Sequence, residues 1–324
     1  MCQWDCGWYS DITFKGYQLV AYPVDGGPIS GQANWAFFPL LPLINKYLIL
    51  LFNNQLAIIA FNQVLLYSSL FLLYDYVKRN FSINAAVMSA FFLAISSENI
   101  YFMSVYTEIL FLFLTLVILF FIERNKYLLA CSVCGLLSAV RFPGFLAVFI
   151  ILYRYLIYID FKFTKIRIIK IILFILISCF GLFCYMIYLH YHVGDFLAFY
   201  HIQRAWGRLG GSWLNVFTAL KSFWSSGYDI DRLMAVISIC ALWLLFKKKM
   251  YMEVIFLGLA LALSLASKSL VSYSRQVFSN YALFVLIGVY VNKNAFKVFF
   301  VTMSMLVLTI TFTYLWLTGS NIVA

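Results

Sequence analysis

The chain has 324 residues, of which 65% are hydrophobic and 11% are charged. A soluble domain is nearer half apolar and a quarter charged, so this composition excludes an ordinary soluble globular protein and indicates a protein with several membrane spans. The net charge of +11 comes from short basic clusters between apolar runs, a pattern typical of the positive-inside bias of membrane proteins and not of nucleic-acid binding.

The first predicted element is a long segment in front of the first apolar helix, "WDCGWYSDITFKGYQLVAYPVDGGPISGQANWAFFPLLPL" (residues 4–43). It is aromatic, carries three Asp and is broken by Gly and Pro, so we expect a long loop in place of a helix. In "AFFPLLPL", two prolines three residues apart should stop a straight helix, while Phe37 and Phe38 bury in the membrane interface. We therefore expect residues 1–54 to form the first extracytoplasmic loop with juxtamembrane helices, and residues 55–324 to form a transmembrane bundle.

Eight apolar runs in the rest of the chain are expected to form spanning helices, because a bilayer crossing needs about 20 apolar residues. They cover residues 55–77, 82–99, 105–122, 171–189, 233–246, 251–267, 277–291 and 297–317. Basic clusters separate them, at Lys78/Arg79, Arg124/Lys126, Arg154 to Lys170, Lys247 to Lys249, and Lys293/Lys297. Placing all of these clusters in the cytoplasm gives one consistent topology.

One further apolar stretch, "YLLACSVCGLLSAVRFPGFLAVFIILY" (residues 127–153), lies between two basic clusters that should be on the same side. It is too short for two full crossings and its middle reads "RFPG". We therefore expect a re-entrant or hinged pair of short helices, with the hinge at Pro143 and Gly144. This arrangement would hold Arg141 at membrane depth, facing protein or a water-filled cavity. The alternative is a single kinked span, which would put a later basic cluster outside.

With this topology, nearly all of the unusual polar residues fall on the extracytoplasmic face. They lie in the opening segment, the turn 96–108, the tip at Arg141, a long loop at about 190–232 and the stretch 267–276. Such a one-sided distribution predicts a functional site on that face.

Three motifs, in this order along the chain, carry a family resemblance. The first is Trp4-Asp5, Tyr9 and Gly16-Tyr17 followed by "AFFPLLP" (Ala36 to Pro42), the second is Tyr106-Thr107-Glu108, and the third is Arg141 with Gly144 in "VRFPGF". Together they resemble the PIG-V family, the second mannosyltransferase of GPI-anchor assembly, and its bacterial relatives. Weaker similarities extend the match to residue 284 or so, in "HIQRAWGR" (His201, Gln203, Trp206 and Arg208) and "SRQVF" at Arg275.

The resemblance implies a GT-C glycosyltransferase, an all-α polytopic membrane enzyme. Such an enzyme moves a sugar, expected here to be mannose, from a polyprenyl-phosphate carrier to a lipid-linked or other acceptor outside the cytoplasm. In these enzymes an Asp of the first extracytoplasmic loop acts as the base, and Asp5 is the matching residue. The site is expected on the extracytoplasmic face of the membrane, which in a bacterial member of the family is the inner membrane.

The residue types agree with that chemistry. A departing phosphate needs cations, which Arg supplies in a bidentate fork, and the acceptor hydroxyl needs a carboxylate to take its proton. Displacement from the opposite face would invert the anomeric centre. We therefore expect Asp5 to be the general base and Arg141, Arg208 and Arg275 to bind the donor phosphate. The expected substrate-binding residues are Trp4, Tyr9, Glu108, His201, Gln203 and Trp206.

Several alternatives remain open on the sequence. Asp11 is the rival base, and Glu108 could instead hold Arg141 in a structural pair. A transporter or flippase for a lipid-linked sugar, another GT-C branch and an inactive partner subunit are rival functions. No cofactor or metal site is indicated, since the CxxC at Cys131 and Cys134 has no further ligand nearby. Members of the family have a spanning helix before the Trp-Asp motif. We therefore expect either that the sequence begins after the true start of the protein or that the protein is a shortened member of the family.

Overall fold

The computed structural model describes residues 3–27, 29–209, 230–267 and 273–319, and over these ranges the chain is helical and contains no strand. Residues 210–229 of the loop expected at 190–232 lie outside the described residues. The α-helices are α1 (Asp5–Lys15), α2 (Leu40–Phe52), α3 (Leu56–Asn80), α4 (Ile83–Ala94), α5 (Asn99–Phe102), α6 (Glu108–Ile122), α7 (Tyr127–Ser138), α8 (Ala147–Tyr158), α9 (Lys165–Ser178), α10 (Phe180–Val193), α11 (Ala198–His201), α13 (Ile230–Lys247), α14 (Tyr251–Ala266), α15 (Tyr273–Phe278), α16 (Tyr281–Val291) and α17 (Ala295–Leu317). Three short 3₁₀ helices in the described chain are η1 (Asn34–Ala36), η2 (Phe142–Leu146) and η3 (Ile202–Trp206).

Two of the described helices, α3 with 25 residues and α17 with 23, are long and apolar enough to cross a bilayer by themselves. The other apolar helices have 10–17 residues, fewer than the about 20 that a straight bilayer crossing needs. Apolar helices of these lengths and this composition indicate a helical membrane protein. They support two spans by length alone, and a third if α9 and α10 are counted as one bent span.

The expected span at 171–189 is interrupted at Cys179, where the chain divides into α9 and α10, which are bent by 51° and can form one span only as a bent pair. The break is stabilised from outside the helix. The hydroxyl of Ser138, at the end of α7, accepts a hydrogen bond from the backbone N–H of Leu182 at 3.1 Å. This bond satisfies one of the amide donors that the first turn of a helix leaves without an intrahelical partner. A contact made across the fold therefore stabilises the start of the helix that follows the interruption.

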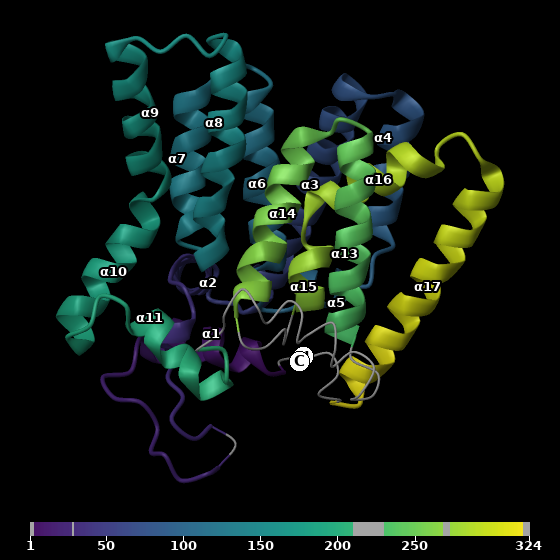
Figure 1. Cartoon of the computed structure of the whole chain (residues 1–324). Coiled ribbons are helices and arrows are strands. Elements are labelled where there is room, and N and C mark those ends of the chain that lie inside the picture. The colour runs from purple at the N-terminus through teal and green to yellow at the C-terminus, as the bar shows by residue number, and fades with distance from the viewer. Residues whose placement is uncertain (1–2, 28, 210–229, 268–272, 320–324) are drawn as a thin grey trace.

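The basic clusters gather at one end of the bundle. Figure 1 shows the turns α8–α9, α13–α14 and α16–α17 at the upper end, while α1, α11 and α15 lie at the lower end. The remaining clusters join them through ion pairs between helices, from Arg124 to Asp75 at 3.6 Å and from Arg154 to Glu123 at 3.4 Å. The segments that carry the expected site residues are thus at the opposite end from the Lys/Arg-rich turns.

The hinged pair is confirmed in its geometry. Helices α7 and α8 pack against each other, and the "RFPG" stretch forms the turn between them, with Arg141 extended and Pro143 in the first turn of η2. Gly144 is needed there, because a Cβ atom at this position would overlap the carbonyl oxygen of Leu137. The chain therefore reverses at this point instead of continuing as one kinked span.

Small residues bring other helices equally close. A Cβ on Gly288 of α16 would overlap the hydroxyl of Ser89 in α4, and one on Gly181 of α10 would overlap the carbonyl oxygen of Gly135 in α7. Close backbone approach at small residues is typical of helix packing in membranes. These crossings fix how α4, α7, α10 and α16 are arranged around the core.

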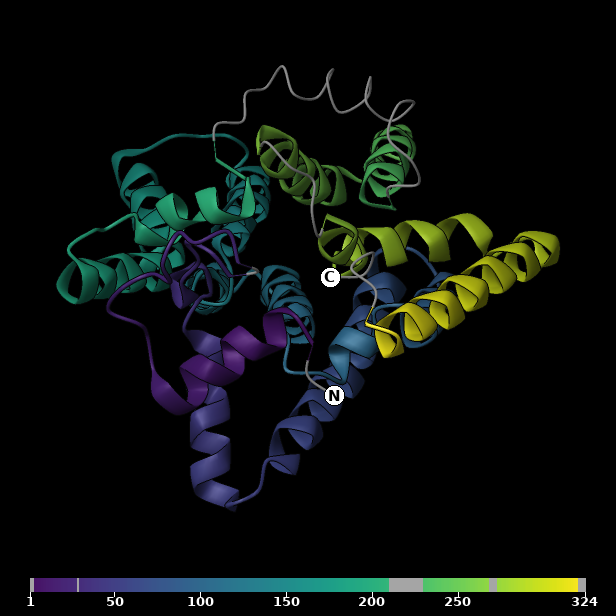
Figure 2. The same ribbon diagram turned by 90° about the horizontal axis from the view of Figure 1, so that it is seen from below.

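The opening segment differs from the expected loop. Residues 5–15 form helix α1, which Figure 2 shows (in purple) lying across the lower end of the bundle between the teal and the blue helices. Pro42 does not stop α2, because it occupies the first turn, where a helix makes no use of the missing N–H. Phe37 and Phe38 are buried in the protein, at 9% and 4% exposure, and do not face a membrane interface. They pack there against the aromatic rings of Tyr9 and of Tyr185.

Candidate functional site

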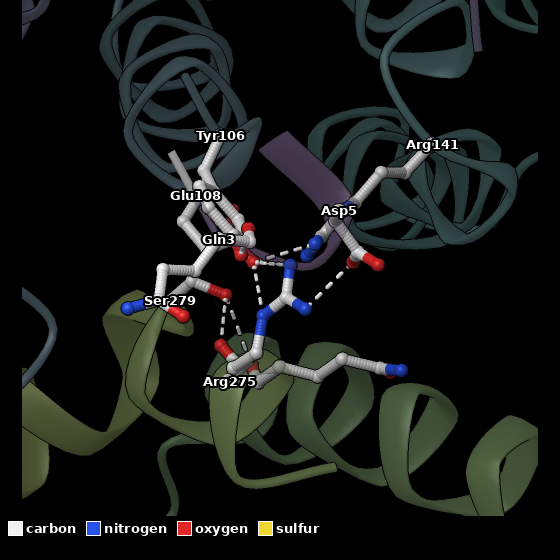
Figure 3. Close-up of polar contacts among 8 residues, drawn as sticks. Gln3, Asp5, Tyr106, Glu108, Arg141, Arg275 and Ser279 are labelled. Carbon is white, nitrogen blue, oxygen red and sulfur yellow. Dashed lines mark hydrogen bonds and ion pairs between the residues drawn. The ribbon is translucent and has the colours of Figure 1, made fainter. Parts of the chain in front are cut away.

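Four charged side chains from four separate segments meet at the lower end of the bundle (Figure 3). Asp5 is the first residue of α1, Glu108 is the first residue of α6, Arg141 precedes η2 and Arg275 lies in α15. The two acids occupy first helical turns, where the partial positive charge of the helix end favours a carboxylate. The structure thus brings together the acid near the amino end and two of the three expected arginines.

Arg275 is the centre of this cluster, with a side chain that is only 2% exposed. Its Nε and Nη2 donate to Oε1 of Glu108 at 2.9 and 2.6 Å, and its Nη1 donates to Oδ2 of Asp5 at 2.7 Å. Arg141 donates through Nη2 to the same Glu108 oxygen at 2.6 Å. The ring of Tyr106 lies 4.6 Å from the guanidinium carbon of Arg275, close enough for a cation–π contact. These charge-assisted bonds fix the two carboxylates relative to each other.

The start of α1 is tied to the turn before α6 and to helix α17, and this sets the direction of Asp5. The hydroxyl of Tyr106 donates to the carbonyl oxygen of Gln3 at 2.7 Å, and the amide of Gln3 donates to the carbonyl oxygen of Trp316 in α17 at 2.9 Å. Trp4 has a φ of +48°, a sparsely populated conformation for a residue with a side chain. Its ring packs edge-on against Trp316 with centroids 5.0 Å apart. The surrounding contacts hold this strained residue in place and thereby orient Asp5.

Asp5 is the more accessible of the two acids. Its side chain is 30% exposed, whereas that of Glu108 is 0% exposed. Burial acts to raise the pKa of Asp5, but the charge and hydrogen bond of Arg275, with further charge from Arg208 and Arg141, outweigh it and hold the pKa below its ordinary value. Asp5 is therefore a carboxylate at neutral pH that a bound molecule can reach, while Glu108 is an internal counter-charge.

A cavity of about 510 Å³ borders the cluster. One part of its wall is cationic, formed by Arg141, Arg208 and Arg275 beside Asp5. The remainder is largely apolar and comes mainly from η2 and α14, with contributions including Pro143, Leu146, Phe256, Ala260 and Leu263. A concave apolar site with a few convergent charged groups fits an amphiphilic ligand with an anionic group. We refer to it as the arginine cavity.

A second cavity of about 580 Å³ adjoins the first, and Asp5, Gln203 and Arg208 line both. Its other walls are rich in aromatic rings and carry one more acid, and they include Trp4, Trp8, Asp11, Tyr22 and Trp206. We refer to it as the tryptophan cavity.

The expected substrate-binding residues divide between these places. Tyr9 lines the arginine cavity, Trp4 and Trp206 line the tryptophan cavity, and Gln203 lines both. Glu108 and His201 line neither. The side chain of Glu108 is fully buried against Arg141 and Arg275, while that of His201 is 57% exposed and its Nδ1 pairs with Asp195 at 2.7 Å. The fold therefore brings all of the expected residues to the lower end but leaves His201 facing outward.

Sequence reasoning missed three residues around Arg275. Tyr106 was visible in the "YTE" motif but received no role, and Tyr101, whose ring lies 5.2 Å from the guanidinium carbon, gave no signal beyond its aromatic character. Glu98, in the turn before α5, is fully buried and neither of its oxygens has a hydrogen-bond partner. Burial and the nearby charge of Glu108 raise the pKa of Glu98 well above its ordinary value.

Within the described residues, no group of three or more His, Cys, Asp or Glu side chains is arranged to hold a metal ion. Comparison of the chain with models of protein families, with curated proteins and with solved structures gives no match. The function is therefore argued from the geometry of the site together with the motif resemblance.

Proposed function

We propose that the chain is a GT-C type glycosyltransferase of the PIG-V kind. In this proposal it moves a sugar, mannose by the family resemblance, from a polyprenyl-phosphate donor to a lipid-linked or other acceptor. The observation that carries the proposal is the pairing of a partly exposed Asp5 with the buried Arg275 at 2.7 Å, at the border of a cavity with cationic and apolar walls. A base for a hydroxyl and cations for a phosphate stand together there, as sugar transfer from a lipid phosphate requires.

The charge balance favours an anionic donor. The three guanidinium groups carry +3 and the carboxylates of Asp5 and Glu108 carry −2, so these five side chains have a net charge of +1. A polyprenyl-phosphate sugar is a phosphodiester with one negative charge, and its isoprenoid chain matches the apolar wall of the arginine cavity. The fork of Arg275 is already engaged by both carboxylates. We therefore assign the phosphate contacts chiefly to Arg141 and Arg208, and a positioning role to Arg275.

The reaction follows from these positions. The acceptor oxygen attacks the anomeric carbon while Asp5 accepts the hydroxyl proton, and the bond from that carbon to the phosphate oxygen breaks. The electron pair leaves with the phosphate, whose growing charge Arg141 and Arg208 stabilise. Attack from the face opposite the phosphate inverts the anomeric centre. No cofactor is consumed, because the phosphate is the leaving group.

The orientation follows from the distribution of basic residues. The Lys/Arg-rich turns at the upper end in Figure 1 belong in the cytoplasm under the positive-inside rule, which puts Asp5 and both cavities outside. We therefore propose that the chain is a multi-pass membrane protein with its site at the outer leaflet. In a bacterium, the membrane would be the inner membrane.

The test is sugar transfer by membranes containing the protein, with radiolabelled polyprenyl-phosphate mannose as the donor. Asp5→Asn removes the proton acceptor and is expected to reduce transfer by at least about a hundredfold, the usual contribution of a general base. Asp25→Asn, in an exposed turn of the same segment, is the matched control and should keep full activity. Transfer that survives Asp5→Asn would move the base to Asp11 or Glu108. Transport of the donor across vesicles without any transfer would favour the flippase alternative.

A further inference from the structure

A third cavity lies beside the bent pair α9–α10, apart from the two cavities at the site. It has a volume of about 830 Å³, and its wall comes from α1 and the residues that follow it, from α2, from α7 and from the bent pair. None of the described residues in this wall also lines the arginine cavity or the tryptophan cavity. We refer to it as the α2–α10 groove.

The surface of the α2–α10 groove is apolar. Leu43 of α2, Leu136 of α7 and Phe180 of α10 line it, and these three side chains are exposed. Two glycines of the same wall let α7 and α10 approach closely, because a Cβ on Gly181 would overlap the carbonyl oxygen of Gly135. In a chain of this composition, such a concave apolar surface faces lipid tails, since its exposure to water would be unfavourable.

A single cation interrupts this apolar wall. Lys46 of α2 is the one charged side chain among the described residues that line the groove. In the described chain its side chain forms no ion pair and no hydrogen bond, whereas Lys15, at the end of α1, pairs with Asp11 at 2.9 Å. A charge beside apolar surface is costly and normally has a partner. Lys46 is therefore available to an anion that the protein itself does not supply.

The depth of Lys46 follows from where α2 begins. The backbone N–H of Leu40, at the start of α2, donates to the carbonyl oxygen of Ala139 at 3.0 Å, just after the end of α7. From there α2 runs across the lower end of the bundle, because Figure 2 shows it side-on, as the blue-violet helix below α1 in that view. Helix α7 has 12 residues and is about 18 Å long, shorter than the hydrocarbon layer of about 30 Å. With α7 starting at the cytoplasmic side, Lys46 then lies within the outer leaflet.

We propose that the α2–α10 groove binds an anionic phospholipid of the outer leaflet. The phosphate pairs with Lys46, and an acyl chain lies along the apolar wall toward the junction of α9 and α10, which Figure 1 shows above α2. This direction matches an outer-leaflet lipid, whose phosphate lies outward and whose chains point to the middle of the membrane. Basic groups in pockets between membrane helices recognise anionic head groups in this way. The inference uses the proposed orientation but does not depend on sugar transfer.

A second copy of the chain would fit this surface less well. Helices α2, α7, α9 and α10 contain no Asp or Glu, so two copies that met through this face would bring Lys46 to a surface without a counter-charge. A phospholipid brings both the apolar chains and the missing negative charge. The same charge argument separates lipids, because phosphatidylglycerol has a net negative charge, whereas the choline of phosphatidylcholine cancels its phosphate.

The experiment measures thermal unfolding of the full-length protein in a neutral detergent by tryptophan fluorescence. Dioleoyl phosphatidylglycerol, dioleoyl phosphatidylcholine and glycerol phosphate, which has no chains, are added to separate samples. Phosphatidylglycerol is expected to raise the unfolding temperature by about 2–5 °C at saturation, and by more than either of the others. Equal shifts from the two lipids, or an equal shift from glycerol phosphate, would overturn the proposal.

Variants then test the groove itself, with bound phosphatidylglycerol measured by native mass spectrometry. Lys46→Gln is expected to weaken binding about fivefold, the usual contribution of one Lys near a lipid phosphate, and Lys46→Arg should keep it. Leu136→Trp, which fills the groove without changing its charge, should also weaken binding. Lys15→Gln is the matched control and should have no effect, since Lys15 lies outside the groove and is paired with Asp11.

Two further results would refute the lipid site. One is an unchanged affinity for phosphatidylglycerol in Lys46→Gln or in Leu136→Trp. The other is a dimer in detergent that Leu136→Trp dissociates, because the groove would then belong to a second copy of the chain. Lipid binding is measured without donor or acceptor, so its failure and the failure of the transferase proposal are distinguishable.

Discussion

Replacing Glu108 by Gln tests whether the buried ion cluster holds the lower end of the bundle together. The substitution keeps the shape of the side chain but removes the charge that accepts three hydrogen bonds, two from Arg275 and one from Arg141. Arg275 is 2% exposed and would keep Asp5 as an acidic partner. Breaking one partner out of a buried pair costs about 3–5 kcal/mol, because the other charge stays desolvated. We expect a loss of stability in that range.

The measurement is thermal unfolding of the purified protein in detergent, followed by tryptophan fluorescence. Glu123→Gln is the matched control, because Glu123 makes a single, longer contact of 3.4 Å with Arg154, and the Arg154 side chain is 34% exposed. Because this pair is only partly buried and its contact is long, its contribution should be about 0–1 kcal/mol, as is typical of surface ion pairs. If Glu108→Gln and Glu123→Gln lower the unfolding temperature equally, the cluster does not carry the stability reasoned here and Glu108 is not the counter-charge of Arg275.

Three further predictions concern other parts of the molecule. The pKa of Asp5 in the folded protein lies below its usual 3.8, so its ion pair contributes stability at pH values above 3.8, and this stability is lost as the pH falls through the folded pKa. The difference in unfolding temperature between wild type and Asp5→Asn should therefore stay constant from pH 7 to about 5. A difference that vanishes in that range would contradict the pairing. Gly288→Ala should destabilise the protein by at least about 1–3 kcal/mol through overlap with α4, whereas Gly258→Ala, where a Cβ meets its nearest atom at 3.6 Å, should not; equal unfolding temperatures would mean that α4 and α16 are less close than described. His201→Ala should leave sugar transfer within about twofold of wild type, since His201 pairs with Asp195 and lines neither cavity; a large loss of activity would return His201 to the site.

The local parts of the fold could be predicted from the sequence. Apolar runs mark helices because hydropathy is a property of each segment, and the "RFPG" turn was readable because Pro and Gly restrict the backbone wherever they occur. The opening helix α1 was missed because the prediction uses only such local patterns. It is short, mixed in polarity and followed by Gly16, so its local pattern does not distinguish a helix from a loop, and contacts with the bundle stabilise it.

Most residues of the candidate site could be predicted from the sequence, but the contacts between them could not. Arg141 drew attention because a charge in an apolar segment is costly and must have a partner, whereas Asp5 and Glu108 did so through their motifs. That Arg275 links Asp5 and Glu108, which are 270 and 167 residues away from it in sequence, depends on how α1, α6 and α15 pack. The outward position of His201 and the division into two cavities have the same origin.

The amino-acid pattern indicates a helical, membrane-type chain with its basic turns and its unusual polar residues in separate segments, because hydropathy and the cost of burying a charge act residue by residue. The packing of the helices sets which charges neutralise one another, which acid remains accessible and where an apparently continuous helix breaks at Cys179. Those outcomes depend on hydrogen bonds and close contacts between segments that are distant along the chain, and no local pattern encodes their geometry.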